Sequence, residues 1–484
     1  MTFLHSFRSR AAGQRPAWPL AAAAVAVALL GGCASPGSSK PQARMLQAQQ
    51  LGLQADAGVF PAEDWWKSFG DAELDRLEQQ ALAGSPGLQQ AQARQRQAQD
   101  ATGIARAALR PHLGAGLSSM HQRLSEYGIF PPPLGGMVYT ENQASLQGGW
   151  ELDFFGRNRA RLQAAIGQAR AAQAQAQAAR VVITADVAQA YFRLAGLVEQ
   201  GQVLQQTLQQ RETIARLVGQ RARAGLDNTL QQRQAQAQIP QLRVSVEANQ
   251  QAQQQARNAL AALIGAGPQA TADLRPELHA VPLPGLPRQL PASLIGRRPD
   301  VVAARWQVQS ALASVDEARA SFYPDINLSA FVGLDALGWD KFLKVGSRTW
   351  GVGPALTLPI FEGGALRANL RATNAGADAA VDEYNATLVG AVREAADAIA
   401  ERRSAQAQIE QQQRALELAD QAHHLARERF DAGLGNELVV LQAQAPVLQL
   451  RQLGAELKAQ ALVDDVALIR ALGGGYDSAA PATP

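Results

Sequence analysis

Two long stretches of this chain contain no proline. They cover residues 157–224 and 365–432, which by subtraction are 68 positions each, and both are rich in alanine, glutamine and arginine. An uninterrupted run of strong helix formers predicts a helix, and at a rise of 1.5 Å per residue each helix would be roughly 100 Å long. Because ordinary globular helices are several times shorter, we expect a fold built around two exceptionally long helices.

Each long stretch carries a narrow apolar seam. The seam positions lie three or four residues apart, as in a coiled coil, and therefore predict packing against a neighbouring helix. A helix that is wet on two sides needs only such a seam, so the pattern fits the wall of a water-filled helical tube; a plain coiled-coil rod is the alternative. The two seams are Val187, Tyr191, Leu194 and Val198, and Val381, Tyr384, Leu388 and Val392.

The chain is internally duplicated. Residues 224–243 align without gaps with 432–451, and the two segments share an Ala-Gly-Leu turn, a Gln-Ala-Gln-Ala run and a Gln-Leu-Arg run. A second match, Ala-Arg-Ala, relates 105–107 to 318–320. The offsets of 208 and 213 are close enough to indicate one duplication with small differences in the loops.

Both halves have the same order of elements: a helix, two alternating stretches, a long helix, a turn and a returning helix. The first helices are expected at 73–110 and 292–322, and the returning helices at 227–265 and 437–472. The chain is accordingly divided into a first repeat (73–265), a proline-rich linker (266–291) and a second repeat (292–472).

Four shorter stretches alternate between apolar and polar residues. In 143–154, leucine, tryptophan and phenylalanine alternate with glutamine, serine and acidic residues; 325–334 and 349–360 alternate in the same way, and the stretch after Pro111 does so more weakly. Because successive side chains of a strand point to opposite faces, each stretch predicts a strand with one apolar face and one polar face.

The strands have a length suited to a membrane. About ten residues are needed for a tilted strand to cross a bilayer, and apolar-out, polar-in alternation fits a β-barrel with a wet lumen. A soluble sheet with one wet face is the alternative. Since side chains already fill the interior of an eight-stranded barrel, four strands cannot enclose a channel, and the chain must oligomerise if they lie in a membrane.

The N-terminus predicts export and lipidation. Residues 1–32 combine an arginine-rich start, an apolar run too short to span a membrane and a Leu-Gly-Gly triplet before Cys33, as in a bacterial lipoprotein signal. Cys33 is the only cysteine, which excludes disulfides and cysteine metal sites; a chance cysteine after an ordinary signal peptide is the alternative. We expect diacylglycerol and an N-acyl chain on Cys33, a lipidated segment over 33–72 and a disordered tail over 473–484.

Charge and motif content exclude several classes of protein. Removal of residues 1–32 removes three arginines and no acid, which leaves 42 basic against 42 acidic residues, so we expect no nucleic-acid partner. No apolar run after the signal is expected to reach the length of a transmembrane helix, so a closed barrel or a lipid tail must attach the protein to a membrane. Without a phosphate loop, nucleophile elbow or metal-ligand spacing, we expect no enzyme, no metal and no cofactor beyond the lipid.

The chain resembles the outer-membrane factors of tripartite efflux systems, in the lipoprotein branch called the NodT or OprM type and more distantly TolC. The resemblance extends from about Cys33 to Gly475. Pro299 suits the first turn of a helix and Asp300 complements the helix dipole, so we interpret the Arg-Arg-Pro-Asp part of the motif as structural. The most specific motifs are Leu294-Ile-Gly-Arg-Arg-Pro-Asp-Val301, Tyr323-Pro324, Trp65-Trp66, the two Ala-Gly-Leu turns and the Ala-Leu-Gly-Gly-Gly ending.

The resemblance implies a mainly α-helical protein with a membrane β-barrel, in which three chains give a twelve-stranded barrel and a twelve-helix tunnel. It implies a lipid-anchored outer-membrane protein that extends into the periplasm. There it would be a passive exit duct for drugs and toxic organic molecules. An inner-membrane pump, commonly of the resistance–nodulation–division class, would deliver them through a periplasmic adaptor. The resemblance assigns adaptor contact to two tips, consisting of Gly225, Leu226 and Asp227, and of Gly433, Leu434 and Gly435.

The resemblance also implies a closed periplasmic entrance just beyond the tips, at Gln231, Glu437, Val439 and Gln442. Many relatives carry aspartates at the positions of Val439 and Gln442. Because neither residue is acidic here, we expect hydrogen bonds and packing to hold the entrance, rather than a carboxylate ring with affinity for cations.

Two other functions are compatible with parts of the sequence. A periplasmic structural coiled-coil lipoprotein would explain the helices and the anchor but not four amphipathic strands. A duct of the same design could instead export metal ions or proteins. The chain has only four methionines, one of them the initiator, which argues against a methionine-lined copper relay.

Overall fold

The computed structural model describes residues 36–53, 60–130, 132–278 and 294–476. The signal, Cys33, most of the linker and residues 477–484 lie outside the described residues. The chain divides into two compact units. Of the described residues, the first unit, here the sheet unit, contains those up to Gln42, Thr102–Ala165 and Ser310–Asp378; the second, the helical unit, contains Ala43–Ala101, Ile166–Gln309 and those from Ala379.

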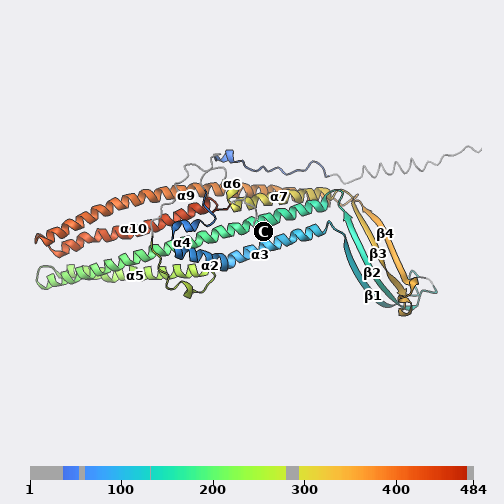
Figure 1. The fold of residues 1–484 in the computed structure, drawn as a ribbon, viewed down its shortest axis with the longest axis horizontal. Coiled ribbons are helices and arrows are strands. Elements are labelled where there is room, and N and C mark those ends of the chain that lie inside the picture. The colour runs from blue at the N-terminus through green and yellow to red at the C-terminus, as the bar shows by residue number, and fades with distance from the viewer. Residues whose placement is uncertain (1–35, 54–59, 131, 279–293, 477–484) are drawn as a thin grey trace, which may run out of the picture. The chain divides into compact units, whose positions relative to one another are not determined.

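The sheet unit contains a four-stranded antiparallel sheet in the order β1-β2-β3-β4 (Figure 1). All four alternating stretches are strands, as predicted. A four-residue helix, α8 (Trp339–Phe342), and a short 3₁₀ turn connect the last two strands. The strands are β1 (His112–Arg123), β2 (Val138–Leu152), β3 (Asp325–Leu337) and β4 (Arg348–Thr357).

The strand register brings the apolar side chains of all four strands to one face. Leu146 of β2 pairs with Ala115 of β1 and with Val332 of β3, and Val332 pairs in turn with Trp350 of β4. Residues directly opposite each other in a ladder share a face. The sheet therefore has one continuous apolar face, and its other face is mainly polar or glycine.

Six of the described helices form three pairs of equal length. The long helices α4 (Arg157–Arg223) and α9 (Ala365–Asp431) have 67 residues each, within one residue of the predicted bounds. The returning helices α5 (Thr229–Leu263) and α10 (Glu437–Ala471) have 35 residues each, and α3 (Pro86–Ala107) and α7 (Pro299–Ala320) have 22 each. These matched lengths support the internal duplication.

The first helix of each repeat is broken, so the prediction of one continuous helix at 73–110 and at 292–322 was wrong. The first is divided into α2 (Ala72–Gly84) and α3, and the second into α6 (Leu294–Arg297) and α7. In both cases a proline, Pro86 or Pro299, begins the second helix. Proline has no N–H to donate and its ring clashes with the preceding turn, but it fits the first turn of a helix.

The C-terminal tail also begins later than predicted, because Gly473–Tyr476 are packed rather than disordered. Gly473 and Gly474 close α10 through hydrogen bonds from their N–H groups to the carbonyls of Arg470 and Ile469. Gly473 lies so close to the Arg297 carbonyl that a Cβ would overlap it. Tyr476 packs against a cluster of buried alanine and valine residues.

The seams predicted for the long helices are buried. In α4, Val187 and Leu194 are fully buried, Tyr191 is nearly so, and Val198 packs at the edge of the same core. One 18-residue window of α4 is, by length and composition alone, apolar enough to cross a membrane, contrary to expectation; half of that window is buried inside the protein. The seam therefore serves helix packing.

The seam of α9 is buried in a different cluster. Val381, Tyr384 and Leu388 pack against Val301 of α7 and its neighbours, whereas Val392 is half-buried. The two repeats thus use equivalent seams for packing, as the spacing predicted.

A carboxyl group lies in the core around α4. Glu78 of α2 is fully buried, and neither of its carboxyl oxygens has a hydrogen-bond partner in the described part of the chain. Leu74, Leu77 and Ala81 of the same helix are buried in that core. Burial, with a smaller effect of Asp75, raises the pKa of Glu78 to about 9. The group is therefore protonated at neutral pH.

We predict that Glu78→Gln removes a pH dependence of stability. Because the folded pKa lies above the ordinary value, the wild type is most stable below that ordinary value and loses stability as pH rises toward 9. The neutral amide should be more stable than the wild type by roughly 3 kcal/mol at pH 7, and the difference should shrink toward pH 4. Thermal unfolding followed by circular dichroism from pH 4 to pH 9 measures this; parallel curves for both proteins would contradict it.

Candidate functional site

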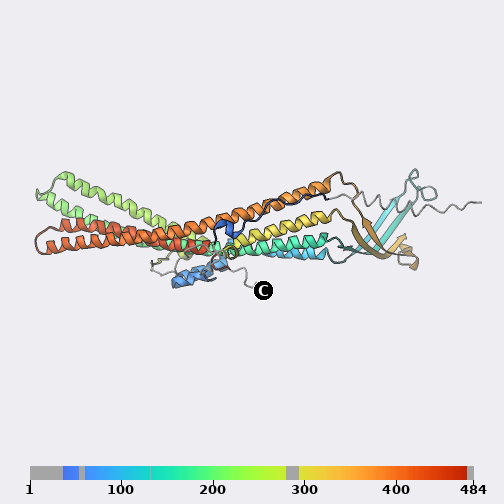
Figure 2. The same ribbon diagram turned by 90° about the horizontal axis from the view of Figure 1, so that it is seen from above.

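The two predicted tips are the turns that join α4 to α5 and α9 to α10, and both lie at the same end of the helical unit (Figures 1 and 2). Gly225 and Gly433 have the same left-handed φ of 73°. In each turn the glycine N–H donates three residues back and the following leucine N–H donates five residues back, which is the Schellman arrangement. The leucines, Leu226 and Leu434, are 67% and 71% exposed.

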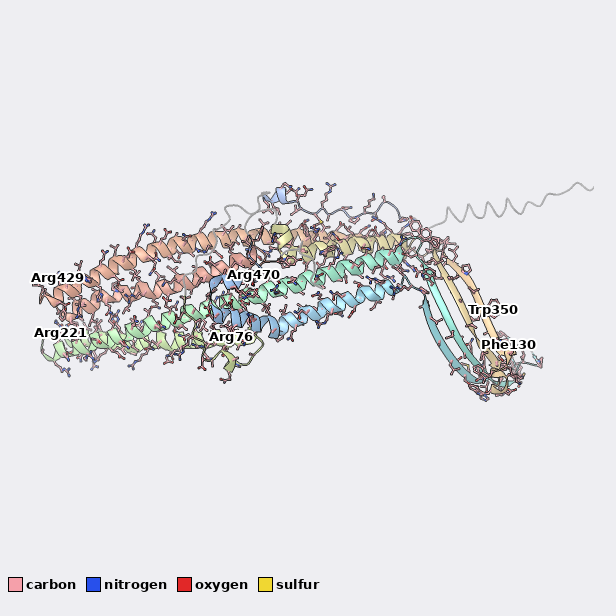
Figure 3. The ribbon with its side chains drawn as sticks, viewed as in Figure 1. Arg76, Phe130, Arg221, Trp350, Arg429 and Arg470 are labelled. Carbon is pink, nitrogen blue, oxygen red and sulfur yellow. The ribbon has the colours of Figure 1, made fainter. Side chains whose placement is uncertain are left out.

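The two tips differ in charge. At the first tip, Arg221 donates from Nε and Nη2 to both carboxylate oxygens of Asp227, at 2.8 and 3.1 Å. This pairing lowers the pKa of Asp227 below its usual value. At the second tip glycine, Gly435, occupies the equivalent position, so Arg429 has no carboxylate partner within the described residues. Figure 3 shows both arginines at the tips.

The entrance residues next to the tips also differ between the repeats. Asn228 caps α5 and accepts from the Gln231 N–H at 2.9 Å, and the Gln231 side chain accepts from the Asn228 N–H at 3.1 Å, which completes a capping box. Asn436 caps α10 by accepting from the N–H of Val439 at 3.1 Å, but the valine side chain cannot return a hydrogen bond. Only the first repeat therefore has a reciprocal cap.

Within the described residues of a single chain, no side-chain hydrogen bond joins the predicted entrance residues to one another. Of Gln231, Glu437, Val439 and Gln442, only Gln231 makes a side-chain hydrogen bond in the part of the chain that the structure describes. Among the described residues no group of three or more acidic, histidine or cysteine side chains could hold a metal ion. The nearby Asp431 pairs with Arg427 on the same helix.

The Arg-Arg-Pro-Asp motif forms a buried link between three helices of the helical unit. Arg298 is 8% exposed, and its Nη2 donates to Asp300 at 2.6 Å and to Glu394 of α9 at 2.9 Å. Its Nη1 donates to the Ala471 carbonyl at the end of α10. Sequence reasoning identified the motif as structural but missed Glu394, because that contact joins residues far apart in the chain.

The apolar face of the sheet is exposed. Leu117, Trp350 and Val352 are 73%, 76% and 67% exposed, and an apolar surface of this kind marks a membrane or protein contact. The edge strands β1 and β4 each have one neighbour among the described strands. Their outer N–H and C=O groups therefore need partners outside the chain.

Cys33, the predicted lipidation site, lies outside the described residues. The segment that follows it is held along α9 in the sheet unit. There the Gln42 N–H donates to Asp378 at 2.6 Å, and Asn374 Nδ2 donates to the hydroxyl of Ser39 at 2.8 Å.

The chain matches the family model described as "Outer membrane efflux protein" over residues 77–266 and 290–474. It is 32% identical to the multidrug resistance outer membrane protein MdtP of Escherichia coli K12, covering 93% of this chain and 95% of that protein. It is 38% identical to the fusaric acid resistance protein FusA of Burkholderia cepacia, covering 74% and 69% of the two chains.

Solved structures show the same architecture. The outer membrane protein VceC of Vibrio cholerae matches with a TM-score of 0.78 and 35% identity, covering 86% of this chain and all of that chain. The outer-membrane channel OprN matches with a TM-score of 0.79 and 28% identity, covering 92% and 99%. The mainly helical fold with a small antiparallel sheet is thus shared with these outer-membrane proteins.

We predict that exchanging Gln231 and Val439 exchanges the stability of the two caps. Val439→Gln should complete a capping box on α10 and stabilise the start of that helix by about 0.5–1 kcal/mol. Gln231→Val should remove the capping box of α5 and destabilise the start of α5 by about the same free energy. Amide hydrogen exchange of the first turns of α5 and α10 measures the effect. Equal exchange in Val439→Gln and wild type at the start of α10 would contradict the assignment, and Gln442→Ala is a control outside the cap.

Proposed function

The chain belongs to the outer membrane efflux protein family, and we propose that three copies of it form the passive exit duct of a tripartite efflux pump. It is an outer-membrane efflux channel whose helices extend into the periplasm. The observation that supports the trimeric duct is the sheet, which is apolar on one face, mainly polar on the other and, among the described strands, unpaired at both edges. A sheet of this kind cannot face lipid alone.

Pairing between subunits satisfies the edges. If β4 of one copy pairs with β1 of the next, every outer backbone group finds a partner and no edge remains. The number three comes from the family, and three four-stranded sheets give twelve strands. Since eight strands are already filled by side chains, twelve leave room for a polar lumen, lined by the serine, glutamine and glycine residues opposite the apolar face.

The tips are proposed to meet the periplasmic adaptor. The two glycine turns have the same backbone conformation, so each chain presents an exposed leucine in the same way at both tips.

The inner-membrane pump, of the resistance–nodulation–division class, supplies the energy. The relatives named for multidrug and fusaric acid resistance support drugs and toxic organic molecules as the cargo. Deletion of the gene should therefore increase sensitivity to such compounds.

Conductance of the purified, acylated full chain in planar bilayers tests the duct. We expect discrete channels, a trimer mass by native mass spectrometry and a β-sheet signal in detergent. A monomer without β-sheet signal would overturn the proposal and leave an anchored helical rod, the alternative that explains the helices but not the sheet.

We predict that the two edge strands can be cross-linked between subunits. The chain has only one cysteine, so Cys33→Ser gives a background for Ala115→Cys on β1 and Val352→Cys on β4. A bifunctional thiol reagent should then produce covalent dimers and trimers in denaturing gels. Each single-cysteine variant is the matched control and should give no trimer; a double variant that stays monomeric would contradict edge pairing.

We predict that trivalent cations do not block the channel strongly at micromolar concentration. Val439 and Gln442 replace the aspartates found in many relatives, and Asp227 is already paired with Arg221. Single-channel recording with cations added from the periplasmic side measures the block. Val439→Asp with Gln442→Asp should introduce it by building a carboxylate ring in the trimer; strong block of the wild type would refute the expectation.

A further inference from the structure

The connection between β3 and β4 carries three cations without acidic partners. Lys341, Lys344 and Arg348 are exposed, and none forms an ion pair within the described residues. The segment 338–350 contains one acid, Asp340, so three cations minus one acid give a net charge of +2. The connection between β3 and β4 can therefore attract an anionic ligand.

The connection is ordered rather than loose. The Lys344 N–H donates to the Lys341 carbonyl at 2.9 Å, and the Ser347 hydroxyl donates to the same carbonyl at 2.7 Å. Phe342 is 8% exposed and lies in edge-on contact with Trp339 at 5.5 Å between ring centres. These contacts fix the backbone from which the cations project.

Large apolar side chains lie among the cations. Trp339, Leu343, Val345 and Trp350 are 61%, 84%, 71% and 76% exposed. Figure 3 shows Trp350 on the sheet. Tryptophan and tyrosine concentrate where a membrane meets water, and long cationic side chains reach from apolar surface to polar head groups.

Strand register places Arg348 on the apolar face. It pairs with Leu334, as Trp350 pairs with Val332, so arginine, tryptophan and Val352 follow one another along the same face of β4. Successive residues on one face are about 7 Å apart. A ligand that meets both ends of this row must combine an anionic group with apolar chains.

We propose that Lys341, Lys344 and Arg348 bind the phosphate groups of a phosphorylated glycolipid in the outer leaflet, with its acyl chains against Trp350 and Val352. This site rests on the proposed function. The helices join the strands at one end of the sheet and extend into the periplasm, so the β3–β4 connection lies at the external end. The apolar face then points to lipid, and the cations lie at head-group level.

The test uses the full chain in detergent and native mass spectrometry. The probes are bis-phosphorylated lipid A, its dephosphorylated form and inorganic phosphate. The wild type should bind the phosphorylated lipid more tightly than the dephosphorylated lipid, and Lys341→Gln with Lys344→Gln and Arg348→Gln should reduce that binding about a hundredfold, at roughly fivefold for each cation. The matched control, Lys341→Arg with Lys344→Arg and Arg348→Lys, should retain it.

Equal binding of both lipids, or unchanged binding by the glutamine variant, would overturn the site. Binding of inorganic phosphate as tight as that of the lipid would overturn the commitment to a lipid. Lys344→Gln alone, a change outside the strands, should still give about a fivefold loss if the triple variant fails to fold. Conductance of the wild type distinguishes failure of the lipid site from failure of the proposed duct. A protein that conducts but binds phosphorylated and dephosphorylated lipid equally refutes only the lipid site.

Discussion

Backbone groups at the edges of a sheet need hydrogen-bond partners, and hydrocarbon offers none. This requirement governs how the sheet can be used. Its apolar face suits lipid, but β1 and β4 would each carry a row of unpaired N–H and C=O groups into the membrane. Side-chain changes cannot satisfy these groups, so only strands from other copies can. If the sheet lies in a membrane, oligomerisation is therefore required by the backbone, while the proposed number of copies comes from geometry and from the family.

In the proposed tunnel the helical unit would meet a different requirement, since a tunnel wall has water on both sides. Its helices cannot bury a wide apolar stripe, and the seams of α4 and α9 are correspondingly narrow. Buried polar contacts add to them: Arg298 joins α7, α9 and the end of α10 through Asp300, Glu394 and a backbone carbonyl. Removing one partner of such a buried charge costs more than an exposed pair contributes, so thin walls depend on a few such links.

Local patterns were sufficient to predict much of this fold. Alternation located all four strands, and the absence of proline located α4 and α9 to within one residue, because both signals act through neighbouring residues. The breaks at Pro86 and Pro299 could also have been predicted from proline chemistry. The packing of Gly473 against Arg297 and the contact between Arg298 and Glu394 join distant parts of the chain, and no local pattern indicates them. Phe331 also escaped the alternation rule, since it lies on the mainly polar face over Gly351.

The two repeats share the backbone conformation of their tips but differ in the side chains around them. Both tips keep the glycine turn, in which a left-handed residue ends the long helix and lets the chain return. The side chains around the turn are free of that constraint, and they have diverged: Asp227 corresponds to Gly435, and Gln231 to Val439. Among the described residues, one tip therefore has an ion pair between Arg221 and Asp227 and a reciprocal cap, whereas at the other tip Arg429 has no carboxylate partner and the cap is one-sided. A ring of three subunits would present these two surfaces alternately. A partner at the tips would therefore contact six turns of nearly the same backbone shape, whose side chains repeat only three times around the ring.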